Sequence, residues 1–571
     1  MLTKERSFGS VFFWRAPWAI PAGLTLLVLS WLTPNHYPPW TSFHSELLAF
    51  VAVALMVLGM LVKATHTAEL PRLTWWILGA LCLPWLQSAL GISLFAGDAL
   101  VVSFYLLTLT GAIWVGHAAI RTSVSSELFM MNFMYAVCIG ALVSAAIGLL
   151  QWLSLEEYLL GMTVFGESGY RALGNMAQPN HLATLLLMGI IALVYLFEKQ
   201  IVGSLALGIG VAFLSMVLLL TQSRTGLLSA SVMAAFAVLK RRDQPFRLKT
   251  VYVIAWAFAL LAGSRLLPLL QKVMLVSSGQ AKGLTDSSGR ELMWQQIAYG
   301  VGQSPWFGYG WNQTPTAHSV GAVAYPGELS LGNAHNFVLD MVAWSGLPVG
   351  LTLSGACFYW LISRARHARS VRAWHAMACL LPFFVHSMLE FPFAYAYFLL
   401  PAGILMGIVE ATRSESSPLR IRPYWLWCIL AVSVTAGVAV VREYFLIEED
   451  FRIVRFENLR VGATPDEYRA PDIHLLTHMG AMLKQARIRA HPDMRKDELE
   501  DLHKVALRFP YAALTFRYAV ALGLNGDPVG ATRQMAVVRG MYGQKYYLQA
   551  IEELRHMQHQ TYPQLSAVLT P

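Results

Sequence analysis

Residues 331–351, LGNAHNFVLDMVAWSGLPVGL, pass from a polar turn into a long apolar run. The same pattern recurs along the 571-residue chain, where apolar runs alternate with short polar connections. Many of these runs approach the roughly 20 residues that a helix needs to cross a bilayer core. Hydrophobic residues make up 56% of the chain and charged residues only 13%, a composition outside the range of soluble enzymes. The sequence therefore predicts an all-α fold, a polytopic membrane helical bundle.

We expect about 13 transmembrane helices on this length criterion. The apolar runs lie at 17–33, 45–62, 73–94, 98–118, 128–152, 181–197, 201–220, 225–239, 250–270, 335–362, 373–389, 393–411 and 423–441. If the N-terminus is cytoplasmic, the inside segments hold 19 Lys and Arg residues and the outside loops before residue 442 hold 6. Inside loops are enriched in basic residues, so the bias predicts this orientation and places the C-terminal region on the outer face. The formal charge of +9 is then a topology signal, and we expect no nucleic-acid partner.

The chain changes in character after residue 441. Acidic and basic residues alternate in 442–571, long apolar runs are absent, and 506–543 reads as a helix, a Gly-Asp-Pro turn and a second helix. We predict a transmembrane domain at 1–441, including an outer loop at 271–334, and a small helical domain at 442–571 that resembles one tetratricopeptide-like unit. A structural cap and a docking surface both remain open as roles for this tail.

Five polar segments interrupt the apolar pattern, and all fall on the predicted outer face. They lie at 166–186, 221–230, 284–296, 332–337 and 386–401. Their common side predicts one shared site. The five cysteines all lie within apolar runs, and no Cys/His ligand spacing accompanies them, so neither a disulfide framework nor a zinc site is indicated.

Three arginines of these segments, Arg171, Arg224 and Arg290, carry forked donors that suit phosphate oxygens. They lie near the expected outer membrane boundary, where a lipid-linked diphosphate would place its charge. The alternative is snorkelling to water, or pairing with a carboxylate such as Glu167 or Glu390.

His335 heads a predicted span, and a neutral imidazole can take a proton from a hydroxyl nucleophile. Asn336 beside it could cap the helix or orient a sugar. From the residues alone, a histidine at a helix entry is more often a capping or interfacial residue than a catalytic one, so catalysis by His335 needs support beyond its spacing.

Several motifs resemble one superfamily. They are SRTG at 223–226, SPWFGYGWNQ at 304–313, AHNFVLDMVAWSGLPVGL at 334–351, RALGNMAQPNHLA at 171–183 and HSMLEFPFAYAYFLLP at 386–401. Together they are similar to the Wzy_C superfamily, which includes WaaL-type O-antigen ligases, Wzy-type polymerases and PglL-type bacterial protein O-oligosaccharyltransferases. The last two motifs, with the C-terminal region, resemble the PglL branch. The resemblance covers most of residues 165–410.

The resemblance implies an inverting, GT-C-like membrane glycosyltransferase of the bacterial inner membrane, with its active site and C-terminal domain in the periplasm. It would move a glycan en bloc from undecaprenyl diphosphate to Ser or Thr of a periplasmic protein such as pilin, without a metal or other cofactor. His335 would be the general base, and Arg224 and Arg290 would stabilise the leaving diphosphate.

Seven further side chains would position sugar or acceptor, with helix packing as the alternative role: Arg171, Gln178, Asn180, Asn336, Glu390, Tyr395 and Tyr397. Ligation to lipid A-core sugar and polymerisation of glycan repeats use similar His and Arg chemistry and stay open. A polysaccharide transporter is the remote alternative. It would line many spans with polar residues through the midplane, whereas ionisable residues within these spans are few and the polar segments gather on one face.

Overall fold

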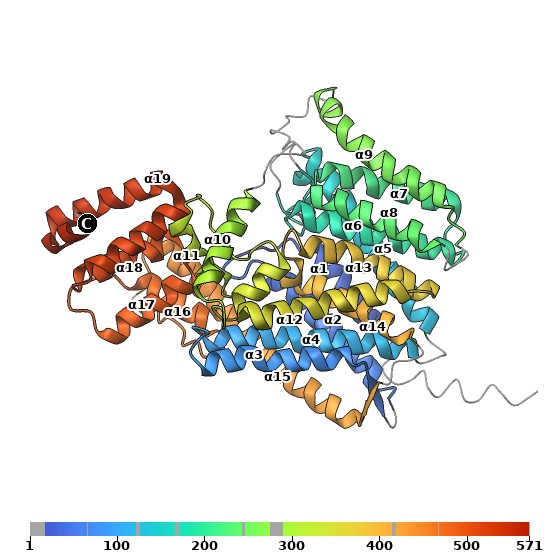
Figure 1. Cartoon of the computed structure of the whole chain (residues 1–571), viewed down its shortest axis with the longest axis horizontal. Helices are drawn as coiled ribbons and strands as arrows, with labels where there is room; N and C mark the ends of the chain where they lie inside the picture. Colours follow the sequence, from blue (N-terminus) through green and yellow to red (C-terminus); the bar gives the residue numbers. More distant parts are fainter. Residues whose placement is uncertain are drawn as a thin grey trace, which may run out of the picture. The chain divides into compact units, whose positions relative to one another are not determined.

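The computed structural model describes residues 18–64, 67–121, 126–165, 171–241, 246–273, 289–413, 418–465 and 467–569, and nearly all of its regular structure is helical (Figure 1). The long helices are α1 (Ala19–Leu32), α2 (Phe43–Leu61), α3 (Leu73–Ala89), α4 (Ala96–Arg121), α5 (Ser126–Trp152), α6 (Pro179–Glu198), α7 (Ser204–Leu220), α8 (Arg224–Leu239), α9 (Thr250–Val273), α10 (Arg290–Gln303), α11 (Thr314–Ala324), α12 (Phe337–His367), α13 (Val371–Ser387), α14 (Ala396–Ala411), α15 (Pro423–Leu459), α16 (Thr477–Arg487), α17 (Lys496–Arg508), α18 (Ala512–Leu524) and α19 (Pro528–Gln560). The described chain also contains a short α20 (Ser566–Leu569), two three-residue strands, β1 (Ala68–Leu70) and β2 (Leu419–Ile421), and three short 3-10 helices, η2 (Glu156–Leu159), η4 (Pro392–Ala394) and η5 (Pro563–Leu565). The all-α prediction is confirmed. Glu167 and the predicted outer-loop residues 274–288 lie outside the described residues.

Each predicted span corresponds to a helix, from α1 to α9 and from α12 to α15, and α12 is kinked at Gly346, which has φ 74° and ψ 170°. Seven helices of the described chain are long and apolar enough to cross a membrane: α2, α4, α5, α6, α9, α12 and α15. A multi-pass helical membrane protein is therefore confirmed, and the total of about 13 spans stays a prediction.

The chain divides into two compact units. Unit 1 comprises Met1–Gly79, Tyr105–Asp286 and Tyr359–Thr435, and unit 2 comprises Ala80–Phe104, Ser287–Phe358 and Ala436–Pro571. The predicted domain boundary between residues 441 and 442 falls inside α15, which continues as one helix to Leu459. The two-domain division predicted from composition stays a prediction.

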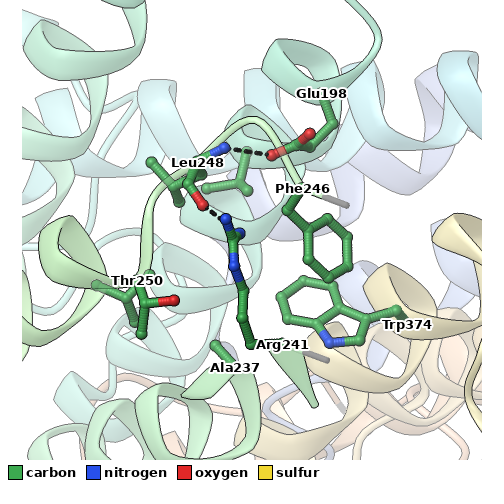
Figure 2. A pocket seen from close by; sticks show the side chains of 9 residues that line it. Glu198, Ala237, Arg241, Phe246, Leu248, Thr250 and Trp374 are labelled. Carbon is green, nitrogen blue, oxygen red and sulfur yellow. Dashed lines mark hydrogen bonds between the residues drawn. The ribbon is translucent and has the colours of Figure 1, made fainter. Parts of the chain in front are cut away.

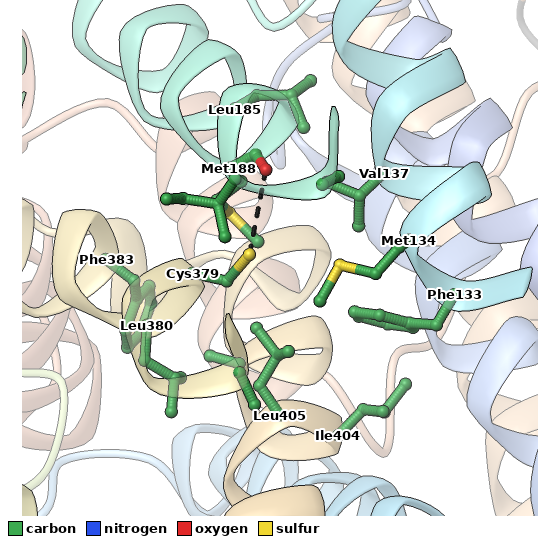
Figure 3. Close-up of a cluster of buried hydrophobic side chains, with 14 of the residues drawn as sticks. Phe133, Met134, Val137, Leu185, Met188, Cys379, Leu380, Phe383, Ile404 and Leu405 are labelled. Atoms are coloured by element: carbon green, nitrogen blue, oxygen red, sulfur yellow. Dashed lines mark hydrogen bonds between the residues drawn. The ribbon is translucent and has the colours of Figure 1, made fainter. Parts of the chain in front are cut away.

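The core of unit 1 is built around α6, whose apolar window is 94% buried. Figure 3 shows side chains of α6 meeting those of α5, α13 and α14, with the Cys379 thiol 3.7 Å from the Met188 carbonyl. Small residues allow these helices to approach closely, as is usual between membrane helices. A Cβ on Gly189 would lie 2.3 Å from the Cβ of Ala141, and a Cβ on Gly407 would lie 2.0 Å from the carbonyl oxygen of Ile113. Larger residues there would separate α6 from α5 and α14 from α4.

Contacts within unit 1 join the predicted cytoplasmic loops to one another. β1 pairs with β2 in antiparallel register, although the two strands lie about 350 residues apart in sequence. Lys240 Nζ donates to the Arg366 carbonyl oxygen at 2.9 Å, and Lys199 lies 2.5 Å from Glu127. These contacts support the grouping of the basic loops on one face, and which face is cytoplasmic stays a prediction.

The C-terminal part of unit 2 contains the predicted helix, turn and helix. α18 ends before Gly526, which has the left-handed φ of 87° that favours glycine. Asp527 then caps α19 by accepting the Gly530 N–H at 2.8 Å, and Pro528 occupies the first turn. This local prediction is confirmed, and the tetratricopeptide likeness stays a prediction.

Candidate functional site

Three polar segments far apart in sequence meet in unit 1 at Asn180, Ser223 and Glu390. Asn180 lies in the first turn of α6, Ser223 caps α8, and Glu390 follows α13. The Ser223 hydroxyl donates to Asn180 Oδ1 at 2.6 Å, and Asn180 Nδ2 donates to Glu390 Oε1 at 3.2 Å. We call these three residues the Asn180 cluster. The structure therefore brings together the predicted segments at 166–186, 221–230 and 386–401.

Two of the predicted arginines adjoin the Asn180 cluster. Arg171 Nε donates to the Thr221 carbonyl oxygen at 2.7 Å, so this side chain supports the turn between α7 and α8. Burial lowers the pKa of Arg171, the positive charge of Arg224 lowers it further, and the carboxylate of Glu390 opposes both effects. Arg224 itself is half-buried at the first position of α8. Arg171 and Arg224 place two guanidinium groups beside the cluster, and guanidinium groups suit an anionic ligand.

Gln178 and Tyr397 have structural contacts in unit 1. The Gln178 side chain caps α6 by accepting the His181 N–H at 2.8 Å. Tyr397 is buried, and its hydroxyl lies 3.3 Å from His181 Nδ1. Tyr395 is half-buried, with its ring 4.7 Å from that of His181. The substrate contacts predicted for these side chains stay predictions.

Sequence reasoning missed a histidine pair beside the Asn180 cluster. The rings of His181 and His386 are 5.4 Å apart, and Thr184 Oγ1 lies 2.8 Å from His386 Nδ1. Both histidines belong to the two motifs that resemble the PglL branch, and this shared membership was the available signal. Glu46 was missed as well: it is buried near the start of α2 and accepts hydrogen bonds from Ser42 and Tyr105. A carboxylate inside a predicted span was its signal.

His335 and Asn336 lie together at the start of α12, in unit 2. Asn336 Oδ1 accepts the N–H groups of Val338 at 3.0 Å and Leu339 at 3.1 Å, so its predicted capping role is confirmed. His335 is half-buried and has a φ of 51°. Residues other than glycine rarely adopt this region, so the surrounding structure must hold the His335 backbone in place.

Asp340 supplies much of that support. Its Oδ1 accepts the Ala334 N–H at 2.8 Å and the Thr314 hydroxyl at 2.6 Å. The Thr314 oxygen in turn accepts the indole N–H of Trp344 at 2.7 Å. Asp340 is fully buried. By accepting these two hydrogen bonds, its carboxylate holds Ala334, the residue immediately before His335, in place. Sequence reasoning missed Asp340, which its charge in an apolar run could have revealed.

Arg290 is connected to the same loop through α10. It is the first residue of α10 and follows Gly289, which has a φ of 70°. One turn later, Trp294 donates its indole N–H to the Ala334 carbonyl oxygen at 3.1 Å. The helix that carries Arg290 therefore also holds the residue before His335. The other predicted residues belong to unit 1, so a single site for all ten stays a prediction.

The pocket drawn in Figure 2 lies at the opposite ends of the helices that carry the Asn180 cluster. Glu198 ends α6 and Arg241 follows α8, whereas Asn180 and Ser223 stand at their starts. A helix of 20 residues, such as α6, is about 30 Å long, so this pocket is remote from the cluster. Glu198 accepts the Leu248 N–H at 2.9 Å, and Arg241 donates to the Leu248 carbonyl oxygen at 2.6 Å. These contacts stabilise the connection from α8 to α9.

The described residues contain no group of three His, Cys, Asp or Glu side chains that could hold a metal ion. Metal independence stays a prediction, since the reaction itself is not observed.

Three families match parts of the chain. The O-antigen ligase family matches residues 209–354, the protein glycosylation ligase family matches 172–197, and the C-terminal family of virulence-factor membrane-bound polymerases matches 374–555. The first match contains Arg224, Arg290 and His335, and the second contains Asn180.

Two curated proteins of Acinetobacter baylyi are similar along nearly their whole length. A general O-oligosaccharyltransferase is 28% identical over 547 residues, which cover 92% of this chain and 93% of the relative. A ComP-specific O-oligosaccharyltransferase is 23% identical over 531 residues, which cover 88% and 91%. These matches confirm the resemblance: the chain is a multi-helix membrane protein related to the O-antigen ligases and the bacterial protein glycosylation ligases.

Proposed function

We propose that the chain is an O-linked oligosaccharyltransferase that moves a preassembled glycan from a lipid-linked donor to a hydroxyl of an acceptor protein. The similarity to two O-oligosaccharyltransferases over about nine tenths of the chain carries this proposal. The donor is undecaprenyl diphosphate oligosaccharide, and the acceptor is a Ser or Thr of a periplasmic protein such as pilin. The positive charge beside the Asn180 cluster supports an anionic donor.

The reaction exchanges one bond at the anomeric carbon for another. The acceptor oxygen attacks that carbon on the face opposite the diphosphate, a glycosidic C–O bond forms, and the C–O bond to the diphosphate breaks with inversion. His335 accepts the acceptor's hydroxyl proton on an imidazole nitrogen, a contribution of about 10² to 10⁴-fold to the rate. The Asp340 network that holds Ala334 supports this role, because a base must be held within hydrogen-bond reach of its proton.

The arginines act on the leaving group. Negative charge builds on the diphosphate as its bond to the sugar breaks, and a guanidinium placed beside it beforehand stabilises that charge. Arg224 and Arg290 have this role in our proposal, and both stand at the first position of a helix. Because the free N–H groups of a helix start also favour anions, the position supports the assignment.

The protein acts in the bacterial inner membrane, with a cytoplasmic N-terminus and a periplasmic active site. The contacts among the basic loops support their common side. A phosphatase reporter that is active only in the periplasm should be active when it is fused after residue 569. The same reporter should be inactive when it is fused within 240–249. The reverse pattern would exclude this orientation.

One experiment tests the reaction and its acceptor. The chain is expressed in a ligase-deficient host together with a lipid-linked glycan pathway and a pilin, and both pilin and lipid A are examined by mass spectrometry. Glycan on pilin is expected. Glycan on lipid A alone would favour the O-antigen ligase function, to which the match at 209–354 also points.

The same assay tests the base. His335→Gln keeps a hydrogen-bonding side chain that accepts no proton at neutral pH, so transfer should fall by about 10²-fold or more while the protein remains inserted and binds donor. His491→Gln is the matched control, because His491 is exposed in the C-terminal region and should be dispensable. Near-normal turnover of His335→Gln would remove His335 from the chemistry.

A further inference from the structure

The segment 325–330 lies shortly before His335 and is largely exposed, whereas Leu331 and Asn333 after it are buried. Pro326, Glu328 and Ser330 are exposed, and such segments open readily unless other elements hold them. One side is held by α10, where Gln296 Nε2 donates to the Tyr325 carbonyl oxygen at 2.7 Å.

The other side is held by α19, a helix more than 200 residues later in the chain. The Gly327 N–H donates to the Gly540 carbonyl oxygen at 2.9 Å. The Tyr542 hydroxyl donates its single hydrogen to the Pro510 carbonyl oxygen at 2.8 Å, so at 3.3 Å it accepts from the Ser330 hydroxyl. Both ends of the exposed stretch 327–330 are thereby attached to α19.

A kink in α19 accommodates Glu328 between these two contacts. Gly543 has φ 83° and ψ 176°, which breaks the helical geometry. A Cβ on Gly543 would lie 2.3 Å from Glu328 Oε1 and 2.5 Å from its Cγ, so the Glu328 side chain occupies the space that only a glycine leaves. The Glu328 side chain therefore packs directly against the kink at Gly543.

α19 is itself firmly seated within unit 2. A Cβ on Gly540 would lie 2.2 Å from the carbonyl oxygen of Ala322, so α19 contacts α11 backbone to backbone. Ala322, Val537 and Met541 form a buried apolar cluster at this contact. A substitution at the kink should therefore move the exposed segment and leave the packed helices α19 and α11 in place.

We propose that Tyr542 and Gly543 are positioning residues for His335, so that the part of α19 at its kink affects turnover although it touches no substrate. This inference rests on the proposed role of His335 as the base. The chain of contacts runs from the α19 kink through 327–330 to the loop that Asp340 and Trp294 hold at Ala334. A displacement of about 1 Å in a catalytic group can lower the rate roughly 10²-fold. Small changes at the kink should therefore lower kcat.

The central test is Gly543→Ala in the purified full-length protein, with lipid-linked glycan and acceptor protein as substrates. The new Cβ should push Glu328 outward and lower kcat by about 10-fold or more, with the KM for donor unchanged. Gly526→Ala is the matched control, since Gly526 has a similar φ of 87° but nothing within 4 Å of its Cβ position. Melting temperatures of the two variants should be alike.

A second substitution distinguishes displacement from general damage. Glu328→Ala removes the atoms that a Cβ at Gly543 would meet, so Gly543→Ala with Glu328→Ala should regain most of the lost kcat. Tyr542→Phe, which removes only the hydroxyl, should lower kcat by about 5-fold, and Tyr546→Phe, at an exposed tyrosine one turn on, should not.

The outcomes separate this inference from the proposed function. If Gly543→Ala matches Gly526→Ala in kcat, or if it loses activity without rescue by Glu328→Ala, the positioning role is refuted. If His335→Gln is nearly as active as wild type in the same assay, the base assignment fails instead. Rescue by Glu328→Ala, together with an inactive His335→Gln, supports both.

Discussion

The buried ion pair between Asp98 and Arg508 should be essential for attachment of the C-terminal helices within unit 2. Asp98 lies in the first turn of α4, and Arg508 ends α17. The Arg508 guanidinium donates to both carboxylate oxygens at 2.8 to 3.1 Å, and the two side chains are only 2% and 10% exposed. Removing one partner leaves the other charge buried and unpaired, a loss of about 3–5 kcal/mol.

Arg508→Met keeps the apolar length of the side chain and removes its charge, so it isolates this effect. A loss of 3 kcal/mol raises the population of opened molecules by roughly 10²-fold. Limited proteolysis of the purified protein, at protease concentrations where opening equilibrates faster than cleavage, measures that population. We expect cleavage within 477–560 to accelerate by about two orders of magnitude.

Two further variants make this reasoning refutable. Asp98→Leu with Arg508→Met removes both charges and should recover most of the lost stability, because apolar replacements of buried pairs are often neutral or better. Lys504→Met is the control on the same helix: Lys504 pairs with Glu500 at 2.7 Å, but the pair is exposed and screened by solvent, so its loss should leave the cleavage rate close to that of wild type. Equal cleavage rates for Arg508→Met and Lys504→Met would refute the argument.

Arg224→Lys keeps the charge but not the fork, so it should retain more transfer activity than Arg224→Ala and less than wild type; equal, full activity in both would make Arg224 a structural residue. Asp340→Ala leaves the Ala334 N–H and the Thr314 hydroxyl without their acceptor, so kcat should fall by at least about 10-fold. Asp340→Asn keeps an accepting oxygen, so its kcat should fall less. Transfer rates at saturating donor measure both. Burial lowers the pKa of His318 to about 4, so the unfolded chain takes up a proton below pH about 6.5 that the folded protein does not. The stabilising contribution of neutral His318 is complete above that pH and is lost as the pH falls towards 4. The melting temperature of His318→Gln should therefore depend less steeply on pH than that of wild type. Identical slopes would contradict this.

Part of the candidate site was predictable because the signals were local. Asn336 was expected as a possible helix cap, since an asparagine before an apolar run is a common helix start, and it has this role. Asn180 and Glu390 were expected on one face because of the span count and the basic loops, and they share a hydrogen bond. The charge of Asp340 in an apolar run signalled a special residue, but its hydrogen-bond partners, like the capping of α6 by Gln178, depend on the fold and were not predictable.

The sequence by itself determined that this is a multi-helix membrane protein, where the helices of its long apolar runs lie, and to which enzymes it is related. Each of these rests on composition, apolar length, charge distribution or short motifs, which are properties of neighbouring residues. Only the tertiary structure decided that Arg171 supports the turn beyond α7, that Arg508 reaches Asp98, and that the kink at Gly543 accommodates Glu328. Those contacts join residues 50 to more than 400 positions apart, and their geometry follows from how helices pack against one another, which no local pattern encodes.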